Sequence, residues 1–446
     1  MKILSRRGAI LLAFLLAFLV GFGVFARDYT AKAATWVKYP ANKHYYVNGQ
    51  PIVGTVYDRN GQVLAQTVGG VRKYNANAVI RTALMQDIGD SAGNVSTGVQ
   101  VVFANRLSGW NLVNGAFRLN TAGKDIRLTL DADLCATAYQ ALAGRSGTVG
   151  VYNYRTGEIL CMASSPSFDP ENPPDVKANA AVYEGVYRNR FLSGTYTPGS
   201  VFKLVTSAAA IDTISDINQK TYTCTGVLTI GPDKVTCPEV HGTVNFKEAL
   251  ADSCNVAFGQ IALQLGSSTL QSYAEKAGFN SALKVDGIPT VAGKVDLSKA
   301  KGANLAWAGI GQYTDTANPL NFMAYVGAIA NGGVRVDPRI LTDSTSPTAQ
   351  VLSAPTAKQL GDMMRNDVVS NYGDSRFKGL QLCAKTGTAQ LAPGQKSDSW
   401  FAGYMARSDC PLAFVVVVEH GGWGISAASP IAGTVLQAAV KKYAGK

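Results

Sequence analysis

The sequence has few charged residues, very little histidine and no repeat of fixed period. Asp, Glu, Lys and Arg make up 16% of the 446 residues, below the roughly 25% of ordinary soluble domains. Only three histidines occur, His44, His241 and His420. Without a glycine or heptad period, the chain is neither collagen-like nor a coiled coil. With 47% hydrophobic residues, it is not expected to be disordered over most of its length.

Long runs of basic residues are also missing, although the chain is basic. The 41 Lys and Arg residues against 30 Asp and Glu give a formal net charge of +11. The lysines are interspersed with other residues, as Lys301 is in the stretch DLSKAKGAN. Dispersed positive charge favours attraction to an anionic membrane surface or wall polymer, and we expect no nucleic-acid partner. At roughly 150 residues per domain, the length predicts two or three folded units.

One apolar run, GAILLAFLLAFLVGFGVFA at 8–26, contains no charge and is long enough to cross the hydrocarbon core of a bilayer. Lys2, Arg6 and Arg7 precede it, which predicts a cytoplasmic amino terminus and an exported body. We expect a retained single-pass anchor in the cell membrane, because the run exceeds the usual length of a signal-peptide core. A cleaved signal peptide is the alternative, since Val24-Phe25-Ala26 offers small residues to a signal peptidase.

Seven cysteines leave at least one thiol unpaired within the chain. Cys224 and Cys237 bracket a short glycine-containing loop, and in an oxidising exterior they are the favoured disulfide. A zinc site that also uses His241 is the weaker interpretation, because only these three ligands lie close together in the sequence. We therefore predict no metal and no cofactor.

The chain divides into segments with different patterns. From 35 to about 125, short apolar runs alternate with turns such as Arg59-Asn60-Gly61, which predicts a small β-rich unit. Asp131 is then expected to cap a helix that continues to about Leu142.

Five strands are expected in the larger carboxyl-terminal part. Two form a hairpin around the turn Arg155-Thr156-Gly157, and three lie near the carboxyl end, before a final helix. The strands fall at 148–153, 158–163, 381–389, 398–406 and 411–419, and the helix at 430–444. Mainly helical segments separate the two groups, so we predict an α/β or α+β domain with an antiparallel sheet covered by helices.

The first of three short motifs is Ser200-Val201-Phe202-Lys203, which follows Pro198-Gly199 at the start of an apolar helix. Ser200 then lies in the first turn, beside free backbone N–H groups, and Lys203 lies one turn further on the same face. This spacing suits a serine nucleophile and a lysine base, provided that the pKa of Lys203 falls from about 10.4 to near 7. Taken alone, the pattern is better explained by an ordinary helix start, in which Ser200 caps the helix and Lys203 extends its side chain to solvent.

The second and third motifs follow in the same order along the chain. Ser253 could relay a proton, and the amide of Asn255 could hold a substrate carbonyl, although both residue types also favour helix caps. Lys385-Thr386-Gly387-Thr388 interrupts an apolar strand, where a glycine indicates close approach of a ligand or another backbone. Lys385 and the hydroxyls of Thr386 and Thr388 would bind a carboxylate. The backbone N–H groups of Thr388 and Ser200 could form an oxyanion hole.

The three motifs together, in this order, are those of β-lactamases and penicillin-binding proteins. The chain resembles the class B penicillin-binding proteins, the monofunctional transpeptidases of bacterial wall synthesis, over nearly its whole length. Further segments that carry the resemblance are VYDRNGQVLA at 56–65, LTLDADL at 128–134, TGEILCMASSPSFDP at 156–170 and IANGG at 329–333.

The resemblance implies a serine transpeptidase fold with a five-stranded antiparallel sheet, carried by a pedestal and one transmembrane helix. The implied divisions are 1–34 for the cytoplasmic tip and anchor, 35–129 for the non-catalytic pedestal and 130–446 for the catalytic domain. Ser200 is implied as the acylated nucleophile and Lys203 as the base. Ser253, Asn255 and Lys385 complete the implied catalytic set, and Thr386, Gly387 and Thr388 the substrate-binding strand.

The implied partners are peptidoglycan stem peptides, β-lactam antibiotics, the membrane and a glycosyltransferase. The glycosyltransferase is expected to be a separate protein, because the pedestal is too short to contain such a domain. The stretch ALMQDIGD at 83–90 departs from the family pattern and leaves the pedestal's interactions open.

Three classes of rival function remain, the third being a non-catalytic binding module. A D,D-carboxypeptidase would share the acyl-enzyme and differ in the attacking group. A class A β-lactamase needs a glutamate between the second and third motifs, where only Glu275 is available, in a helix that we expect to be solvated. A non-catalytic scaffold would be expected to lose Ser200 or Lys203, and a sensor would be expected to carry a signalling domain for which the residues before the anchor leave no room.

Overall fold

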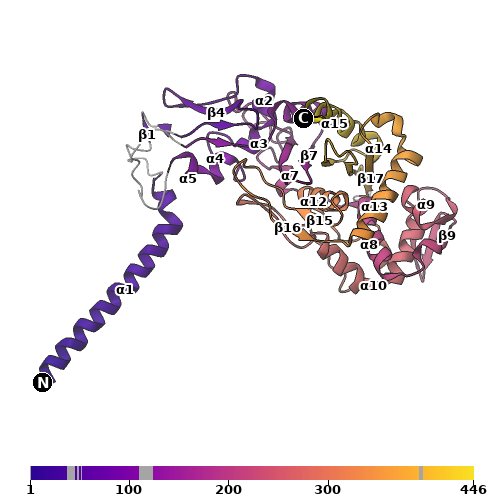
Figure 1. Ribbon diagram of the computed structural model, residues 1–446, viewed down its shortest axis with the longest axis horizontal. Helices are drawn as coiled ribbons and strands as arrows, with labels where there is room; N and C mark the ends of the chain where they lie inside the picture. Colours follow the sequence, from indigo (N-terminus) through magenta and orange to yellow (C-terminus); the bar gives the residue numbers. More distant parts are fainter. Residues whose placement is uncertain are drawn as a thin grey trace.

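A computed structural model describes residues 2–37, 46–47, 50–51, 53–109, 124–390 and 395–445. Helix α1 (Lys2–Val37) projects from the rest of the molecule, as Figure 1 shows. Its segment Arg6–Lys32 is apolar and long enough to cross a membrane, and none of its most apolar stretch is buried within the protein. The apolar run at 8–26 therefore lies on a single exposed helix.

A five-stranded antiparallel sheet forms the centre of the larger part, in the order β17-β18-β19-β7-β8. Its strands are β7 (Gly147–Asn153), β8 (Ile159–Ser165), β17 (Leu382–Ala389), β18 (Asp398–Met405) and β19 (Leu412–Val418). The late strands thus join the early hairpin through β19, as the sequence predicted. Every residue of β18 and β19 is buried, so both faces of the sheet are covered.

The covering helices follow from the apolar segments between and after the strands. Helices α6 (Ala132–Leu142) and α15 (Ser429–Tyr443) pack against each other and the sheet, and α12 (Pro319–Ala330) packs on β7, β18 and β19. As predicted, the Asp131 side chain caps α6 by accepting a hydrogen bond from the Leu134 N–H at 3.0 Å.

A helical region lies beside the edge strand β17 (Figure 1). Its helices are α8 (Lys203–Thr213), α9 (Phe246–Ala251), α10 (Asn255–Lys276), α11 (Ala303–Gly309) and α13 (Ala354–Asp367). Four antiparallel pairs of short strands lie in the segments between helices. They are β9 (Thr221–Cys224) with β12 (Gly242–Asn245), β10 (Val227–Ile230) with β11 (Asp233–Thr236), β13 (Lys284–Val285) with β14 (Ile288–Pro289), and β15 (Val334–Val336) with β16 (Thr348–Gln350). Two further short helices are α7 (Arg190–Ser193) and α14 (Gly424–Ala427).

The predicted β-rich unit is only partly β. Strands β3 (Val56–Tyr57), β4 (Val63–Val68), β5 (Val71–Tyr74) and β6 (Ile126–Arg127) form a sheet in the order β5-β4-β3-β6, and β1 (Tyr46–Val47) pairs with β2 (Gln50–Pro51). Short helices, which the turn pattern did not predict, follow at α2 (Ala78–Ala83), α3 (Met85–Ile88), α4 (Val99–Val102) and α5 (Ala104–Leu107). Residues 38–45, 48, 49, 52 and 110–123 of this unit lie outside the described residues.

The stretch 83–90 contains α3, which contacts β8 of the five-stranded sheet. The Gln86 amide donates to the backbone oxygens of Pro166 and Val186, and the Asn189 amide donates to Asp87 at 2.9 Å. One hydrophobic core continues from the amino-terminal sheet into the five-stranded domain. The stretch 83–90 therefore joins the two parts of the molecule.

Candidate active site

Ser200 lies in a 3-10 turn, Gly199–Phe202, that leads directly into α8, and its side chain is partly exposed. Gly199 has a φ of +55°, and a Cβ atom there would lie 2.7 Å from the carbonyl oxygen of Thr388. Its N–H also donates to the oxygen of Gly311 at 2.9 Å. A larger residue at 199 would separate these backbones, so glycine lets the serine turn sit against β17.

Lys203 is fully buried and its ammonium group reaches the polar groups of the first two motifs. Its Nζ lies 3.2 Å from Ser200 Oγ, 3.1 Å from Ser253 Oγ and 2.8 Å from Asn255 Oδ1. Burial, together with the neighbouring Lys385 cation, lowers the pKa of Lys203 to about 7. A lysine with this pKa can accept a proton near neutrality.

The second motif occupies the bend between α9 and α10. Ser253 has a φ of +53°, a left-handed conformation uncommon for a residue with a side chain, which turns its carbonyl and hydroxyl toward Lys203. Asn255 begins α10, and its amide nitrogen donates to the oxygen of Thr236 at 2.9 Å. This bond fixes the amide so that its oxygen accepts from Lys203.

The third motif runs along the edge of the sheet. The side chains of Thr386 and Thr388 are partly exposed, whereas Lys385 is buried. A Cβ atom on Gly387 would lie 2.7 Å from the carbonyl oxygen of Pro198, which explains the glycine that interrupts this strand. The close approach of another backbone, predicted from the sequence, is confirmed.

Two residues that the sequence reasoning missed hold Lys385 in place. The Tyr372 hydroxyl lies 3.2 Å from Lys385 Nζ and accepts from the Thr386 N–H at 3.1 Å. The buried carboxylate of Asp367 lies 3.9 Å from the same Nζ. Burial alone would lower the pKa of Lys385, but Tyr372 and Asp367 raise it above its ordinary value, so this lysine stays charged. Both residues lie in a helical segment without motif character, and no local signal marks them.

The three motifs line one cleft of about 640 Å³. Its walls include Ser200, Ser253 and Asn255 on one side and Thr386 and Thr388 on the other. Every predicted site residue is thus brought together, with the buried pair Lys203 and Lys385 beneath the cleft walls. The arrangement offers a nucleophile, a base and hydrogen-bond donors for an acyl-transfer reaction.

The glutamate that a β-lactamase interpretation requires is elsewhere. Glu275 is exposed near the end of α10, where Gln271 donates to its carboxylate at 2.8 Å. It does not line the cleft. The solvated position expected for Glu275 is confirmed.

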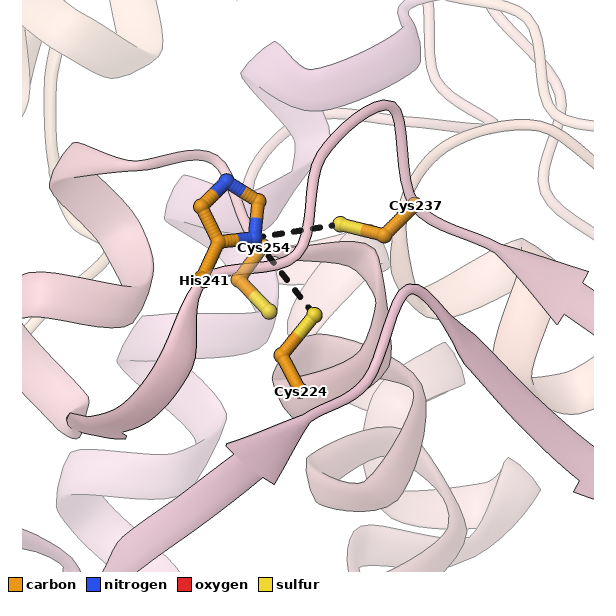
Figure 2. A group of neighbouring side chains, drawn as sticks. All are labelled: Cys224, Cys237, His241 and Cys254. Carbon is orange, nitrogen blue, oxygen red and sulfur yellow. Dashed lines mark hydrogen bonds between the residues drawn. The ribbon is translucent and has the colours of Figure 1, made fainter.

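The predicted disulfide between Cys224 and Cys237 is wrong for this structure, in which all seven cysteines are free thiols. Both sulfurs face the ring of His241, at 3.5 and 3.4 Å from its Nδ1, as Figure 2 shows. Cys254 joins them from the second motif. Sequence proximity suggested a pair, whereas the fold brings four side chains together, with their sulfur and ring nitrogen atoms within 4.8 Å of one another.

A family profile described as the penicillin binding protein transpeptidase domain matches residues 147–437. The chain therefore belongs to the penicillin-binding transpeptidase family, and its resemblance to class B penicillin-binding proteins is confirmed.

Individual relatives agree with this membership. The chain is 26% identical to the peptidoglycan D,D-transpeptidase PbpA of Mycolicibacterium smegmatis over 382 residues, which cover 76% of this chain and 77% of that protein. It is 28% identical over 361 residues to the peptidoglycan D,D-transpeptidase MrdA of Acinetobacter baumannii, covering 69% of this chain and 53% of the relative.

Solved structures share the fold. The D,D-transpeptidase domain of a peptidoglycan glycosyltransferase from Eggerthella lenta superposes with a TM-score of 0.74 at 27% identity, covering 87% of this chain and 98% of that chain. Penicillin-binding protein A from M. tuberculosis, solved as a ceftriaxone acyl-enzyme complex, gives a TM-score of 0.75 at 24% identity, covering 87% and 98%. The predicted fold class, including the five-stranded antiparallel sheet, is confirmed.

Proposed function

We infer that this protein is a peptidoglycan D,D-transpeptidase that cross-links stem peptides through an acyl-enzyme on Ser200. The observation that carries this function is the 3.2 Å contact between the Ser200 hydroxyl and Lys203 Nζ, at the floor of a cleft bounded by the Lys385-Thr386-Gly387-Thr388 strand. Lysine with a pKa near 7 is a base that needs no histidine.

In the first half-reaction, neutral Lys203 takes the proton of the Ser200 hydroxyl while Oγ attacks the carbonyl carbon between two terminal D-alanines. The backbone N–H groups of Ser200 and Thr388 stabilise the negative charge that develops on the carbonyl oxygen. The C–N bond then breaks, and the proton passes from Lys203 through the Ser253 hydroxyl to the departing amine. D-Alanine leaves and an ester on Ser200 remains.

In the second half-reaction, an amine of a neighbouring stem peptide attacks this ester. The amine gives a proton to Lys203, the C–O bond to Ser200 breaks, and the serine hydroxyl regains the proton. A new amide bond joins the two stems. β-Lactams acylate the same serine because their strained amide occupies the position of the D-alanyl-D-alanine bond.

The strand side of the cleft binds the substrate's terminal carboxylate. The hydroxyls of Thr386 and Thr388 line the cleft and donate hydrogen bonds to this carboxylate. Lys385 is buried behind them and attracts the carboxylate as a fixed positive charge. Asn255 orients the substrate backbone from the opposite wall.

The protein is anchored in the cell membrane by α1, with its amino terminus in the cytoplasm and its catalytic domain outside. The exposed apolar segment Arg6–Lys32 and the basic residues around Arg6 support this orientation. Residues 35–129 form a pedestal, residues 130–446 the catalytic domain, and a separate glycosyltransferase supplies the glycan strands.

The function is tested with the full chain in detergent, incubated with a fluorescent penicillin and analysed by peptide mass spectrometry. We expect a stable adduct on the peptide that contains Ser200, and none in Ser200→Ala. Ser207→Ala is the matched control on the same helix, because its buried hydroxyl has no hydrogen-bond partner among the described residues and does not line the cleft. Absence of an adduct from folded protein would favour a scaffold, and rapid drug hydrolysis would favour a β-lactamase.

A second assay separates transpeptidation from carboxypeptidation. A synthetic stem peptide is supplied with and without an amine acceptor, and the products are separated by chromatography. We expect the cross-linked product to predominate when the acceptor is present. Release of D-alanine with hydrolysis alone, whatever the acceptor concentration, would identify a D,D-carboxypeptidase.

A further inference from the structure

Four side chains beside the active site direct potential metal ligands at one point. They are Cys224 at the end of β9, Cys237 after β11, His241 before β12 and Cys254 before α10. Figure 2 shows their sulfur atoms and the imidazole Nδ1 converging from these separate segments. All four ligand atoms lie within 4.8 Å of one another.

The spacing of these atoms fits a single tetrahedral ion. With Zn–S near 2.3 Å and Zn–N near 2.05 Å, tetrahedral geometry places sulfur and nitrogen about 3.6 Å apart. The observed distances from His241 Nδ1 are 3.5 Å to Cys224 Sγ and 3.4 Å to Cys237 Sγ. Both distances agree with this tetrahedral separation, and the two sulfurs approach the same ring nitrogen.

Backbone N–H groups complete the surroundings of two of the sulfurs. The N–H of Asn255 donates to Cys237 Sγ at 3.2 Å, and the N–H of Ala257 donates to Cys254 Sγ at 3.4 Å. Both donors belong to the first turn of α10, whose dipole also favours negative charge. Such donors stabilise thiolates and are typical of the outer shell of a metal site.

We propose that Cys224, Cys237, His241 and Cys254 bind one structural Zn²⁺ ion. Three thiolates and one imidazole are a complete ligand set for structural zinc, with no position left for a reacting water. The soft sulfur ligands disfavour Mg²⁺ and Ca²⁺, which bind oxygen. Zinc has no redox chemistry of its own, and a bound ion protects these thiols from oxidation outside the cytoplasm.

The site explains how the second motif is held. Cys254 lies between Ser253 and Asn255, the two residues of the second motif that contact Lys203. Because Ser253 has a positive φ, its conformation depends on what surrounds it. Zinc bound to both Cys254 and Cys237 fixes the backbone on which Ser253 and Asn255 lie. Cys254 is therefore a positioning residue, a role that rests on the proposed acylation chemistry.

The first test measures metal in the full chain, purified in detergent under reducing conditions without a polyhistidine tag. Elemental analysis is expected to find about one zinc per chain, lost on treatment with a chelator under denaturing conditions. A chain that holds no zinc and takes up none when Zn²⁺ is added to the folded, reduced protein would overturn the proposal. So would a Cys224–Cys237 disulfide in the peptide map of freshly isolated protein.

The second test compares Cys237→Ser and His241→Ala with Cys410→Ala. Serine at 237 still accepts a hydrogen bond from the Asn255 N–H but is a poor zinc ligand, so the variant isolates the metal contribution. Cys410 is a matched control, since it is buried and free but lies between β18 and β19, outside the cluster. We expect both cluster variants to lose zinc and to be acylated by penicillin about 10–100-fold more slowly, with the control unchanged.

Different experimental results would contradict the metal site and the proposed function. Zinc bound by wild type and retained by both cluster variants would overturn the ligand assignment. Where a variant does not fold, the wild-type chain is refolded with and without Zn²⁺, and the bound metal is measured afterwards. Refolding that needs no zinc and leaves no zinc bound would overturn the metal site. Bound zinc in a protein that penicillin does not label would contradict the transpeptidase function and leave the metal site standing.

Discussion

At the scale of single residues, the site depends on two buried lysines with opposite behaviour. Lys203 loses its proton near neutrality because burial and a second cation disfavour its charge. Lys385 keeps its charge because Tyr372 and Asp367 compensate its burial. The pair therefore places a lysine that can act as the proposed base beside a fixed positive charge.

The rate of acylation should depend on the protonation of Lys203. Because its pKa is lowered to about 7, the neutral base is lost as pH falls through 7. The second-order acylation rate constant is expected to be about a hundredfold lower at pH 5 than at pH 8, measured by stopped-flow with a fluorescent penicillin.

The protonation of Asp367 must be distinguished from that of Lys203, because burial raises the pKa of Asp367 to about 7 as well. Its negative charge raises the pKa of Lys203, so Asp367→Asn should move the midpoint of the rate profile to lower pH. A flat profile between pH 5 and 8, or one that disappears in Asp367→Asn, would contradict Lys203 as the base.

Tyr372→Phe should weaken the strand side of the cleft. The change removes a hydroxyl that contacts Lys385 Nζ and accepts from the Thr386 N–H, and an unpaired buried donor costs about 1–3 kcal/mol. We expect penicillin acylation to slow by about tenfold or more while the mass of the Ser200 adduct is unchanged. Tyr57→Phe, outside the cleft, is the control, and equal rates for the two variants would argue against this role.

At the scale of elements, the site depends on how closely the serine turn approaches β17. Gly199 and Gly387 each lie where a Cβ atom would meet backbone oxygen of the other segment. Trp400 on β18 supports the same contact by donating from its ring to the oxygen of Thr197 at 3.0 Å. Backbone packing therefore sets the distance between the Ser200 turn and the backbone of Thr388.

Gly387→Ala should push these elements apart. Its new methyl group would lie 2.7 Å from the Pro198 carbonyl oxygen and 3.0 Å from Trp400 Cβ. We expect a loss of about 1–3 kcal/mol in unfolding free energy, measured by denaturant titration, together with slower acylation. Gly433→Ala is the control, because it lies in α15 with its nearest neighbour at 3.7 Å and should leave stability unchanged or slightly raised. Similar losses in both variants would refute the packing argument.

At the scale of the whole molecule, the amino-terminal sheet and the five-stranded domain share one core. Polar contacts join them as well. Arg81 forms two hydrogen bonds of 2.6 Å with Asp169, whose pKa is lowered to about 2 chiefly by this guanidinium. Burial raises the pKa of Asp87, which accepts from Asn189 across the same boundary. These contacts predict that the two parts unfold together.

Asp87→Ala should destabilise both parts at once. The substitution leaves the buried Asn189 amide without its acceptor, at a cost of about 1–3 kcal/mol. Calorimetry is expected to show one transition moved to lower temperature by about 1 °C for each kcal/mol, because a cooperative unit of this size has a large unfolding entropy. Lys177→Ala, on an exposed loop, should not move the transition. Two separate transitions would show that the parts unfold independently.

The sequence by itself determined the features that local pattern encodes. The apolar run at 8–26, the five strands and the Asp131 cap follow from periodicity and turn chemistry. The order and spacing of the three motifs could be read directly from the sequence. In the first motif, the spacing of Ser200 and Lys203 corresponds to one helical turn. The close approach at Gly387 was also visible, since glycine weakens an apolar strand unless another backbone or a ligand comes close to it.

Only the tertiary structure decided which distant segments meet. Tyr372 and Asp367 reach Lys385 through the packing of α13 against β17, and nothing in their local sequence indicates this. Helices α2 and α3 of the amino-terminal unit pack on α6 and β8 of the second domain, a tertiary contact that the local pattern of turns did not predict. The sequence spacing of Cys224 and Cys237 suggested a disulfide, but the fold also brings Cys254 and His241 to them from separate segments. The chemistry of a cysteine depends on the atoms that surround its sulfur, and only the tertiary structure shows those atoms.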